Sequence, residues 1–477
     1  MTASVPLASV PRSSAAAPPS RPVTERTTMT HAPLFSDPTD DGRPPFGPDD
    51  VDALADDLVG LLGPRGVSGL PRALARAGRD GSQMSPVLSA QPIGHADLVC
   101  FPRTLDALPE IVRAAVQHGV PITTRGKGTG NYGQVVPRFG GLVLDMTSLT
   151  QVGFEGDEGG DTVTAEAGAR MITLEAAAWR RNRQLWMYPS TVQSTIGGFL
   201  AGGSAGTGTI VHGRNHMGFV TALDVVYATD EPELVRLEGD AAQPLVHTYG
   251  VAGVIGRATV RLEPLQDWRC VYVSYATQHE AFAALRRLAE VTPLPRLLSA
   301  DGPAIVAALP EDPAFVAGRA NLRGIFDEAA LPQVHDLVRD TGGRIEAVRD
   351  GIDQSLKLST LSYNHPTWWL QKAHPGVYFH LECSGEALVT RLDEVQAVYP
   401  GGIVHLEAGH GTMFGMLNAP FESREQILAG IRPLAELGIS VHSPHQWYVD
   451  LEPERIRRLA QRTDPHGLLN PGRWMAA

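Results

Sequence analysis

The sequence predicts an α+β fold in two successive regions. In the first region, short apolar or β-branched segments alternate with amphipathic helical segments. From residue 268 onward the pattern changes to four units, each a strand followed by a helix, which favours an antiparallel sheet covered by helices. A glycine-rich loop at residues 126–133 directly follows a β-branched segment, and the first region is organised around it.

The first region can be divided into elements by its periodicity and its turn residues. In order, the prediction is a helix at 51–62, a loop at 81–86, a strand at 97–101, a helix with Thr104 as its N-cap, strands at 120–124, 141–146 and 162–168, a helix at 171–181 and a strand at 222–228. The second region gives strand and helix pairs at 271–275 and 280–290, 320–326 and 329–340, 377–383 and 386–398, and 412–417 and 424–437.

Composition and charge exclude several classes of protein. At 477 residues the chain can hold two or three domains with sizeable cores. Its net charge of −12 argues against a nucleic-acid partner, and no apolar stretch approaches the length of a membrane span. The cysteines, Cys100, Cys270 and Cys383, are scattered and odd in number, which suits a reducing compartment, so we expect a cytoplasmic protein.

The N-terminal residues 1–48 are expected to be a disordered tail. They are rich in proline, serine, alanine and threonine, and they contain no apolar core of a signal peptide. Met29 is a second candidate start besides Met1.

The glycine-rich loop has glycine at positions 126, 128, 130 and 133, with Arg125 and Lys127 adding positive charge. Glycines at this spacing let successive backbone N–H groups point into one concavity, which suits a pyrophosphate. Residues 128–133 formally match the Rossmann fingerprint, but residues 134–141 are a poor helix. A P-loop would need serine or threonine at 128 and glycine at 121, where Gly128 and Pro121 stand. A glycine-rich turn without a ligand is the remaining alternative.

Four blocks together carry a resemblance to a known family. They are Arg-Gly-x-Gly-Thr-Gly at 125–130, Ser-Thr-Ile-Gly-Gly at 194–198, Gly-x-x-Gly-x-x-Gly at 250–256, and Asp-Pro-x-Gly-x-x-Asn-Pro-Gly at 464–472. In order and spacing they resemble the FAD-binding oxidoreductases of the vanillyl-alcohol oxidase and p-cresol methylhydroxylase (PCMH) type. The nearest branch is the FAD-linked D-2-hydroxyacid dehydrogenases, which act on glycolate or D-lactate.

The resemblance implies a domain organisation. A PCMH-type FAD-binding domain of two subdomains would occupy residues 49–266, and an α/β cap domain with an antiparallel sheet would occupy residues 267–440. Residues 441–477 would return to the FAD-binding domain.

The resemblance also implies which residues contact FAD. Those at the pyrophosphate are Thr124, Arg125, Gly126, Lys127, Gly128, Thr129, Gly130 and Asn131, and those on its far side are Ser194, Thr195, Ile196, Gly197 and Gly198. Those expected at the isoalloxazine are Pro189, Ser190 and, from the C-terminal segment, Asn470, with Ile255 on the adenine side. The alternative for the glycines at 197–206 is tight packing of small residues under a sheet, a use compatible with cofactor contact.

We expect the flavin to be non-covalent. Covalent relatives carry a histidine where this chain has Thr129, and doubly linked ones have a cysteine near residues 189–191. No cysteine lies between Cys100 and Cys270, although a histidine of the cap could still form a bond.

Oxidation of an alcohol needs a base for the hydroxyl proton and a cation for the carboxylate or the reduced flavin. His445 lies where hydroxyacid dehydrogenases carry Gly-Glu-His-Gly, a pattern from which this sequence departs. His365 is a second candidate base, with Lys372 as its anion-binding partner, in a segment similar to one of some bacterial relatives. The structural alternatives are a surface or core histidine at 445 and an exposed loop with two packed tryptophans around 365.

A metal is not expected. His405 and Glu407 would share one strand face with His410 just beyond, but the His-x-Gly-Asp-Gly-Asn motif of metal-binding relatives is absent. A strand of the cap facing the pocket is the preferred interpretation of this segment.

The resemblance implies an FAD-dependent oxidoreductase that oxidises a C–OH substrate, with a small 2-hydroxy acid favoured, by hydride transfer to flavin N5. The electron acceptor would be O2 or a separate carrier, and a homodimer is one candidate assembly. One alternative is a tailoring oxidase of a bulkier alcohol, phenol or biosynthetic intermediate. Another is a non-catalytic flavin-binding subunit for electron transfer, and a non-flavin anion-binding protein is the most distant alternative.

Overall fold

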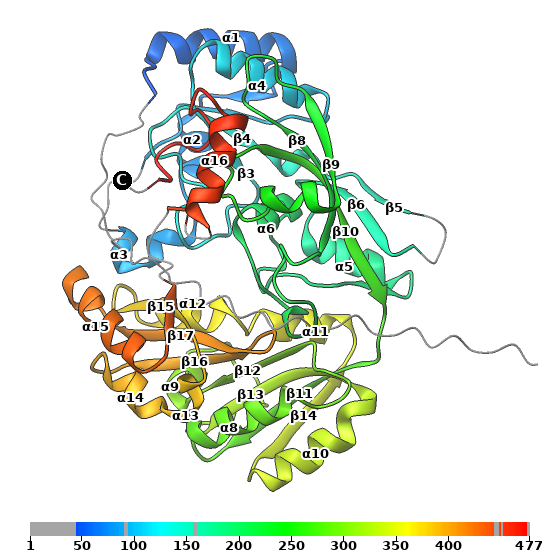
Figure 1. The fold of residues 1–477 in the computed structure, drawn as a ribbon, viewed down its shortest axis with the longest axis vertical. Helices are drawn as coiled ribbons and strands as arrows, with labels where there is room; N and C mark the ends of the chain where they lie inside the picture. Colours follow the sequence, from blue (N-terminus) through cyan, green and yellow to red (C-terminus); the bar gives the residue numbers. More distant parts are fainter. Residues whose placement is uncertain (1–43, 90–93, 156–159, 443–447, 450–451, 475–477) are drawn as a thin grey trace, which may run out of the picture. The chain divides into compact units, whose positions relative to one another are not determined.

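The computed structural model describes residues 44–89, 94–155, 160–442, 448–449 and 452–474. Of the predicted tail at 1–48, residues 1–43 lie outside the described residues. His445 also lies outside them. Within the described residues the chain has three sheets with helices packed on them, so the predicted α+β class is confirmed (Figure 1).

The first sheet contains β3, the strand that directly precedes the glycine-rich loop. Its strand order is β1–β2–β4–β3, and β4 pairs in parallel with both β2 and β3. Its core is built from the apolar stripes of α1 and α4 packed on strand residues such as Ile122 and Leu142. The elements of this part are α1 (Pro48–Leu62), β1 (Val67–Ser68), α2 (Pro71–Ala77), η1 (Gly81–Met84), α3 (Pro86–Ser89), β2 (Leu98–Cys100), α4 (Ala107–Gln117), β3 (Ile122–Arg125) and β4 (Leu142–Asp145).

Two local predictions in this part were wrong. The helix expected to start at Thr104 begins at Ala107, because residues 104–106 form a turn and Asp106 takes the N-cap position. Its predicted stripe of Leu108, Ile111 and Val112 is nevertheless buried. The loop expected at 81–86 contains the 3-10 turn η1 and the start of α3 instead.

The second sheet is antiparallel and carries the other cofactor-candidate segments. Its order is β5–β6–β10–β8–β9, with β7 also paired to β10. A register shift between Ile255 and Arg257 bends β10 beside β8. The elements are η2 (Met146–Ser148), β5 (Val152–Phe154), β6 (Thr162–Glu166), α5 (Met171–Trp179), β7 (Arg183–Leu185), α6 (Ile196–Gly202), α7 (Thr209–His212), β8 (Val220–Val226), β9 (Leu234–Glu238), η3 (Gly239–Ala241), η4 (Gln243–Leu245) and β10 (Val254–Pro264).

The third sheet begins at Trp268, next to the boundary predicted near 266. It is antiparallel throughout, in the order β14–β11–β13–β12–β16–β17–β15–β18. Residues alternate along β11: Val271 and Val273 join the core under α8, whereas Cys270 and Tyr272 join the core under α11 (Figure 1).

Both faces of this third sheet are therefore covered by helices. The elements are β11 (Trp268–Tyr275), α8 (Gln278–Leu288), β12 (Leu297–Asp301), α9 (Pro303–Val306), β13 (Ala320–Asp327), η5 (Glu328–Ala330), α10 (Leu331–Asp340), β14 (Arg344–Asp350), α11 (Ile352–Ser359), α12 (Asn364–Ala373), β15 (Tyr378–Ser384), α13 (Ala387–Thr390), α14 (Leu392–Ala397), β16 (Ile403–Ala408), β17 (Met413–Pro420), α15 (Arg424–Glu436) and β18 (Ser440–His442), and after the sheet comes α16 (Pro453–Thr463).

The four predicted strand and helix pairs are present, with one correction: the helix expected at 386–398 is divided into α13 and α14 at Arg391. In this part of the chain the prediction missed the strands β12, β14 and β18 and the helices α9, α11 and α12. The segment around His365, for which an exposed loop was the alternative, is therefore helical.

Candidate functional site

The glycine-rich loop follows β3 and lies against the N-terminus of α6. A Cβ atom added at Gly126 would stand 2.1 Å from Thr195 Oγ1, so this close approach requires glycine. Thr195 is the N-cap of α6, and its hydroxyl oxygen accepts a hydrogen bond from the N–H of Gly198 at 3.2 Å. Two segments predicted at the pyrophosphate, 124–131 and 194–198, are therefore side by side.

The two cations of the loop have different environments. Arg125 is buried and donates from Nη1 to the backbone oxygen of Ala77 at 3.1 Å. Burial lowers the pKa of the Arg125 guanidinium group. This group lies under Gly128, whose backbone φ is +63°. Lys127 is exposed. Arg125 thus fixes the loop to α2, and Lys127 is the cation that solvent can reach.

Asp80, which the sequence analysis did not single out, supports the loop from the preceding turn. Its carboxylate accepts hydrogen bonds from the N–H of Ser82 at 2.9 Å and the N–H of Gly133 at 2.9 Å. The N–H of Gly81 donates to the oxygen of Gly130 at 2.8 Å. Burial raises the pKa of Asp80 despite these donors. The loop is therefore held at both its start and its end.

Asn470 joins three distant segments behind the same loop. Its Nδ2 donates to the backbone oxygens of Gln134 at 2.9 Å and Tyr249 at 2.6 Å. Its N–H donates to the oxygen of Ile122 in β3 at 2.7 Å, and its Oδ1 accepts from Arg473 Nε at 3.0 Å. Because every polar group of its side chain is used in this way, Asn470 positions the loop.

Left-handed backbone conformations gather around this point. His247, Tyr249 and Asn470 have φ values of 59°, 54° and 43°. Such conformations are strained for large side chains, and they cluster at functional sites. Two hydrogen bonds hold the strained segment: His247 Nδ1 is 3.0 Å from the oxygen of Gly203, and the N–H of Tyr249 donates to the oxygen of Ala201 at 2.8 Å.

The segment at 188–190 is held between the second sheet and α12. A Cβ atom added at Gly206 would lie 2.0 Å from the backbone oxygen of Tyr188, so this close approach requires glycine. The N–H of Tyr188 donates to the backbone oxygen of Thr207 at 3.1 Å. The Tyr363 hydroxyl, at the N-cap position of α12, donates to the oxygen of Gly206. Pro189 and Ser190, predicted near the isoalloxazine, are buried at this junction.

Ile255 lies on β10 and is linked to the 194–198 segment through backbone hydrogen bonds. The oxygen of Gly256 accepts from Ala167 at 2.8 Å, and the oxygen of Ala167 accepts from Gly197 at 2.9 Å. Ile255 itself is 8% exposed, so it retains a small accessible surface.

The N-terminus of α12 faces the glycine-rich loop. Asn364 Nδ2 donates to the hydroxyl of Tyr132, a loop residue that the sequence analysis did not single out. Several buried polar atoms without a hydrogen-bond partner among the described residues lie on these segments: Gln134 Nε2, Ser194 Oγ, Asn364 Oδ1, His365 Nδ1, Thr367 Oγ1 and Trp369 Nε1. Unsatisfied buried donors and acceptors are costly, and a ligand with many polar atoms would satisfy them. FAD, with a pyrophosphate and a polar ring system, fits this donor and acceptor set.

The predicted catalytic residues are only partly brought together. His365 and Lys372 lie on the same helix, α12, two turns apart. Burial lowers the pKa of His365 to about 4, so its imidazole is neutral at pH 7. Lys372 is exposed, with Nζ 5.0 Å from the Trp368 ring centroid and 4.6 Å from that of Trp369. His445 lies outside the described residues.

A buried network of charges, here called the cap network, lies on three strands of the third sheet: Asp301, Arg323, His405 and Glu407. His405 Nδ1 is 2.7 Å from Asp301 Oδ1, and its Nε2 is 2.7 Å from Glu407 Oε1. Arg323 Nη2 donates to Asp301 Oδ2 at 2.7 Å. All four side chains are at most 1% exposed. Burial alone would lower the pKa of His405, but the two carboxylates raise it to about 9, so this histidine is protonated.

The cap network fixes the segment that leads into α12. Arg323 Nε donates to the oxygen of Leu361 at 2.9 Å, and the N–H of Tyr363 donates to Glu407 Oε1 at 2.6 Å. Tyr363 is held in a left-handed conformation with a φ of 56°. Glu407 Oε2 is buried and has no hydrogen-bond partner among the described residues. His405 and Glu407 were expected from the sequence to share a strand face, whereas Asp301 and Arg323 were not expected beside them.

His410, the third residue weighed for a metal, is not part of this network, since its Nδ1 lies 3.0 Å from the oxygen of Ile210. Within the described ranges, no group of three or more histidine, cysteine, aspartate or glutamate side chains has a geometry that could hold a metal ion. Among the helices of the described part, none has the length and apolar character needed to cross a membrane.

Comparison with known proteins identifies residues 96–234 of the chain. Residues 96–234 match the family described as FAD binding domain. The chain is similar to D-lactate dehydrogenase of Archaeoglobus fulgidus, with 26% identity over 209 residues, which covers 41% of this chain and 46% of that protein. It is also similar to the glycolate oxidase subunit GlcD of Bacillus subtilis, with 32% identity over 180 residues, covering 35% of this chain and 37% of that subunit.

A likeness in fold extends further than the likeness in sequence. The structure of an alkyldihydroxyacetonephosphate synthase superposes with a TM-score of 0.70 at 16% identity, covering 92% of this chain and 88% of that one. The matches to D-lactate dehydrogenase and GlcD span less than half the length of each of these two proteins. Residues 96–234 of this chain are therefore a PCMH-type FAD-binding domain, and FAD is its cofactor.

Proposed function

We propose that this protein is an FAD-dependent oxidoreductase that oxidises the C–OH group of a small 2-hydroxy acid. The observation that carries the proposal is the contact between the glycine-rich loop and the N-terminus of α12 through Asn364 and Tyr132. Buried polar atoms of Asn364, His365 and, before α6, Ser194 have no hydrogen-bond partner within the described part of the chain. The names of the relatives, a D-lactate dehydrogenase and a glycolate oxidase subunit, support the substrate class.

The residues that would hold the cofactor are those of the loop, of the segment 194–198 and of the segment 188–190. When bound, FAD supplies a hydride acceptor at N5 of its ring. The loop offers backbone N–H groups and the exposed Lys127 to the pyrophosphate. Thr129 offers no nucleophile comparable with a histidine, so we propose that FAD is held without a covalent bond.

His365 would accept the hydroxyl proton of the substrate. Its neutral imidazole is in the correct protonation state, and its Nδ1 has no partner in the described part of the chain. A pKa of about 4 makes the imidazole of His365 a weak base by itself. The carboxylate of a bound 2-hydroxy acid would raise that pKa, because an anion beside the ring stabilises the imidazolium form. Proton acceptance by His365 is thereby coupled to the arrival of an anionic substrate.

Lys372 would act on the incoming anion and not directly on the reacting carbon. It lies about 10 Å along the helix from His365, and it is exposed above Trp368 and Trp369. His445, outside the described residues, stays the alternative base.

Anaerobic mixing of the FAD-loaded protein with D-lactate, glycolate and related acids tests the proposal. We expect at least one acid to bleach the visible flavin absorbance. His365→Asn should retain FAD and slow bleaching by about a hundredfold or more, because it removes a positioned base. The control is His335→Asn on α10, an exposed histidine, which should bleach at the wild-type rate.

Retained colour with every acid would reject the 2-hydroxy acid and favour a bulkier alcohol or biosynthetic intermediate. Wild-type bleaching by His365→Asn would remove this residue from the reaction. Acid precipitation of the same sample should leave the yellow colour in the supernatant, and a yellow pellet would contradict the non-covalent assignment.

A further inference from the structure

Residues 206–208, here called the linking segment, contact the residues predicted at the isoalloxazine. The backbone oxygen of Thr207 accepts a hydrogen bond from the N–H of Tyr188 at 3.1 Å. A Cβ atom added at Gly206 would lie 2.8 Å from the Cα atom of Pro189, so the two chains touch at their backbones. Close-packed backbones transmit displacements, and a movement of the linking segment would therefore move Tyr188 and Pro189.

The linking segment is also bound to the part of the chain that begins at β11. The Tyr363 hydroxyl donates to the backbone oxygen of Gly206. Thr207 Oγ1 donates to Ser359 Oγ at 2.8 Å, and both of these residues are 0% exposed. A buried donor or acceptor that loses its partner is costly, so these two hydrogen bonds determine where the linking segment lies.

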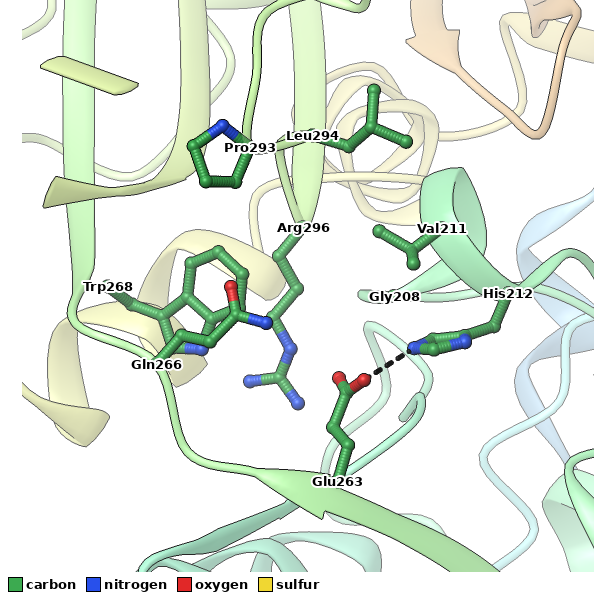
Figure 2. A pocket seen from close by; sticks show the side chains of 9 residues that line it. All are labelled: Gly208, Val211, His212, Glu263, Gln266, Trp268, Pro293, Leu294 and Arg296. Carbon is green, nitrogen blue, oxygen red and sulfur yellow. Dashed lines mark hydrogen bonds and ion pairs between the residues drawn. The ribbon is translucent and has the colours of Figure 1, made fainter. Parts of the chain in front are cut away.

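The end of the linking segment depends on hydrogen bonding more than on packing. Gly208 borders a cavity of about 240 Å³, whose other walls include Val211, Trp268 and Arg296 (Figure 2). The N–H of Gly208 donates to the backbone oxygen of Arg296 at 2.8 Å. Because atoms that border a cavity have fewer packing contacts, hydrogen bonds carry more of the restraint here.

Tyr363 is itself held at its backbone and at its ring. Its N–H donates to Glu407 Oε1 at 2.6 Å, which fixes the residue in its left-handed conformation. Its ring lies 5.7 Å from that of Phe414 in β17, measured between centroids, and the residue is 6% exposed. The hydroxyl is therefore presented to Gly206 from a fixed position.

The two residues that follow Tyr363 belong to the proposed site. Asn364 Nδ2 donates to the Tyr132 hydroxyl of the glycine-rich loop, and His365 is the proposed base. The start of α12 thus contacts the linking segment through residue 363 and the glycine-rich loop through residue 364. Reaction rates depend steeply on the placement of catalytic groups, and an error of about 1 Å can cost about a hundredfold.

We propose that Tyr363 is a positioning residue for flavin reduction. Its hydroxyl, by binding Gly206, keeps the segment predicted at the isoalloxazine at a fixed distance from the helix that carries His365. This inference rests on the proposed function, in which His365 is the base. Tyr363 acts through Gly206 and does not touch the reacting atoms.

Tyr363→Phe tests the inference, because it removes only the hydroxyl and retains the ring and the N–H. In stopped-flow experiments with an acid that reduces the wild type, we expect the limiting rate of flavin reduction to fall by about tenfold or more. The apparent Kd values of the acid and of FAD should change by less than about twofold.

Tyr272→Phe is the matched control. The Tyr272 hydroxyl is buried in the same apolar cluster as Tyr363, and it has no hydrogen-bond partner among the described residues. This variant should be reduced at the wild-type rate. Equal limiting rates for both variants, whether slowed or not, would overturn the role of the Tyr363 hydroxyl.

Visible circular dichroism of the bound flavin distinguishes positioning from a loss of stability, and it requires no substrate. At saturating FAD, Tyr363→Phe should change the flavin bands, whereas Tyr272→Phe should leave them as in the wild type. Unchanged bands in Tyr363→Phe would overturn the inference. If no acid reduces the wild type, the proposed function fails, and the dichroism alone decides on Tyr363.

Ser359→Ala provides a second variant if Tyr363→Phe fails to fold. It removes the acceptor of Thr207 Oγ1 and so releases the linking segment at its middle residue. We expect the same direction of change in the flavin bands. Wild-type bands in Ser359→Ala would show that the hydrogen bonds of the linking segment do not position the flavin, and would overturn the inference.

Discussion

The glycine-rich loop is held in position by backbone groups, whereas the cap network holds the start of α12 in position by buried charged side chains. The loop is positioned by backbone groups and by the absence of side chains, as where Gly126 meets Thr195. The cap network uses four fully buried charged side chains that hold one another and then hold the start of α12. The loop therefore depends on the absence of side chains at its glycines, whereas the cap network depends on all four of its charged side chains being present together.

The largest effect is expected when one partner leaves the cap network. Arg323→Met should reduce the free energy of unfolding by about 3 to 5 kcal/mol, because Asp301 then keeps a buried charge with one partner fewer. Arg339→Met is the control, since Arg339 forms an exposed ion pair with Asp336 at 2.7 Å, and it should change stability by less than about 1 kcal/mol. Chemical denaturation measures both, and equal losses would show that burial is not what makes the network strong.

A smaller effect is expected from pH. The pKa of His405 is raised from 6.5 to about 9 in the folded state, so the folded protein holds this proton more tightly than the unfolded chain does. The resulting stabilisation is fully present below pH 6.5 and is lost as pH rises through about 9. The expected loss across this window is about 3 kcal/mol in denaturation experiments. His405→Asn should lack this component, and an unchanged pH dependence in that variant would assign the effect to other groups.

The smallest effect is expected at the loop. Gly126→Ala places a methyl group against Thr195 Oγ1, which must rotate away from its capping position or displace the loop. The loss of about 1 to 3 kcal/mol should weaken FAD binding by roughly tenfold to a hundredfold with little change in fold. Gly153→Ala in β5 is the control, because a Cβ there meets no atom within 4 Å. Flavin titration decides between them, and equal affinities would mean that close packing at Gly126 is not required.

The difference between the two regions also explains what could be predicted from the sequence. The loop is contiguous, and its glycines and the following blocks are visible in the chain, so the FAD-binding domain could be predicted. The cap network is assembled from β12, β13 and β16, and its pairing depends on the strand register, which places Asp301 opposite His405. The sequence did offer one signal for Asp301: it directly follows the mostly apolar residues 297–300, and a charged residue beside such a segment is buried only when it has a partner.

Some residues of the candidate site and some helix boundaries could not be predicted because they depend on local contacts that leave no pattern in the sequence. Asp80 and Tyr132 have no motif that marks them, because their role comes from hydrogen bonds to backbone and side-chain groups elsewhere. Thr104 is a residue type that favours the N-cap position, but residues 104–106 form a turn, so α4 begins at Ala107. The α12 helix was missed because Pro366 and paired tryptophans weaken its helical pattern, while proline is tolerated in the first turn.

The attachment of Asn470 behind the loop has a consequence for biosynthesis. Residue 470 follows its partner Gln134 by 336 positions, and the neighbouring Leu468 and Asn470 complete the backbone pairing of Ile122 in β3. During translation the loop therefore emerges from the ribosome long before its last supports exist. If FAD binds at this loop as proposed, stable cofactor loading follows the synthesis of residues 468–473, because a shorter nascent chain lacks the groups that hold the loop from behind.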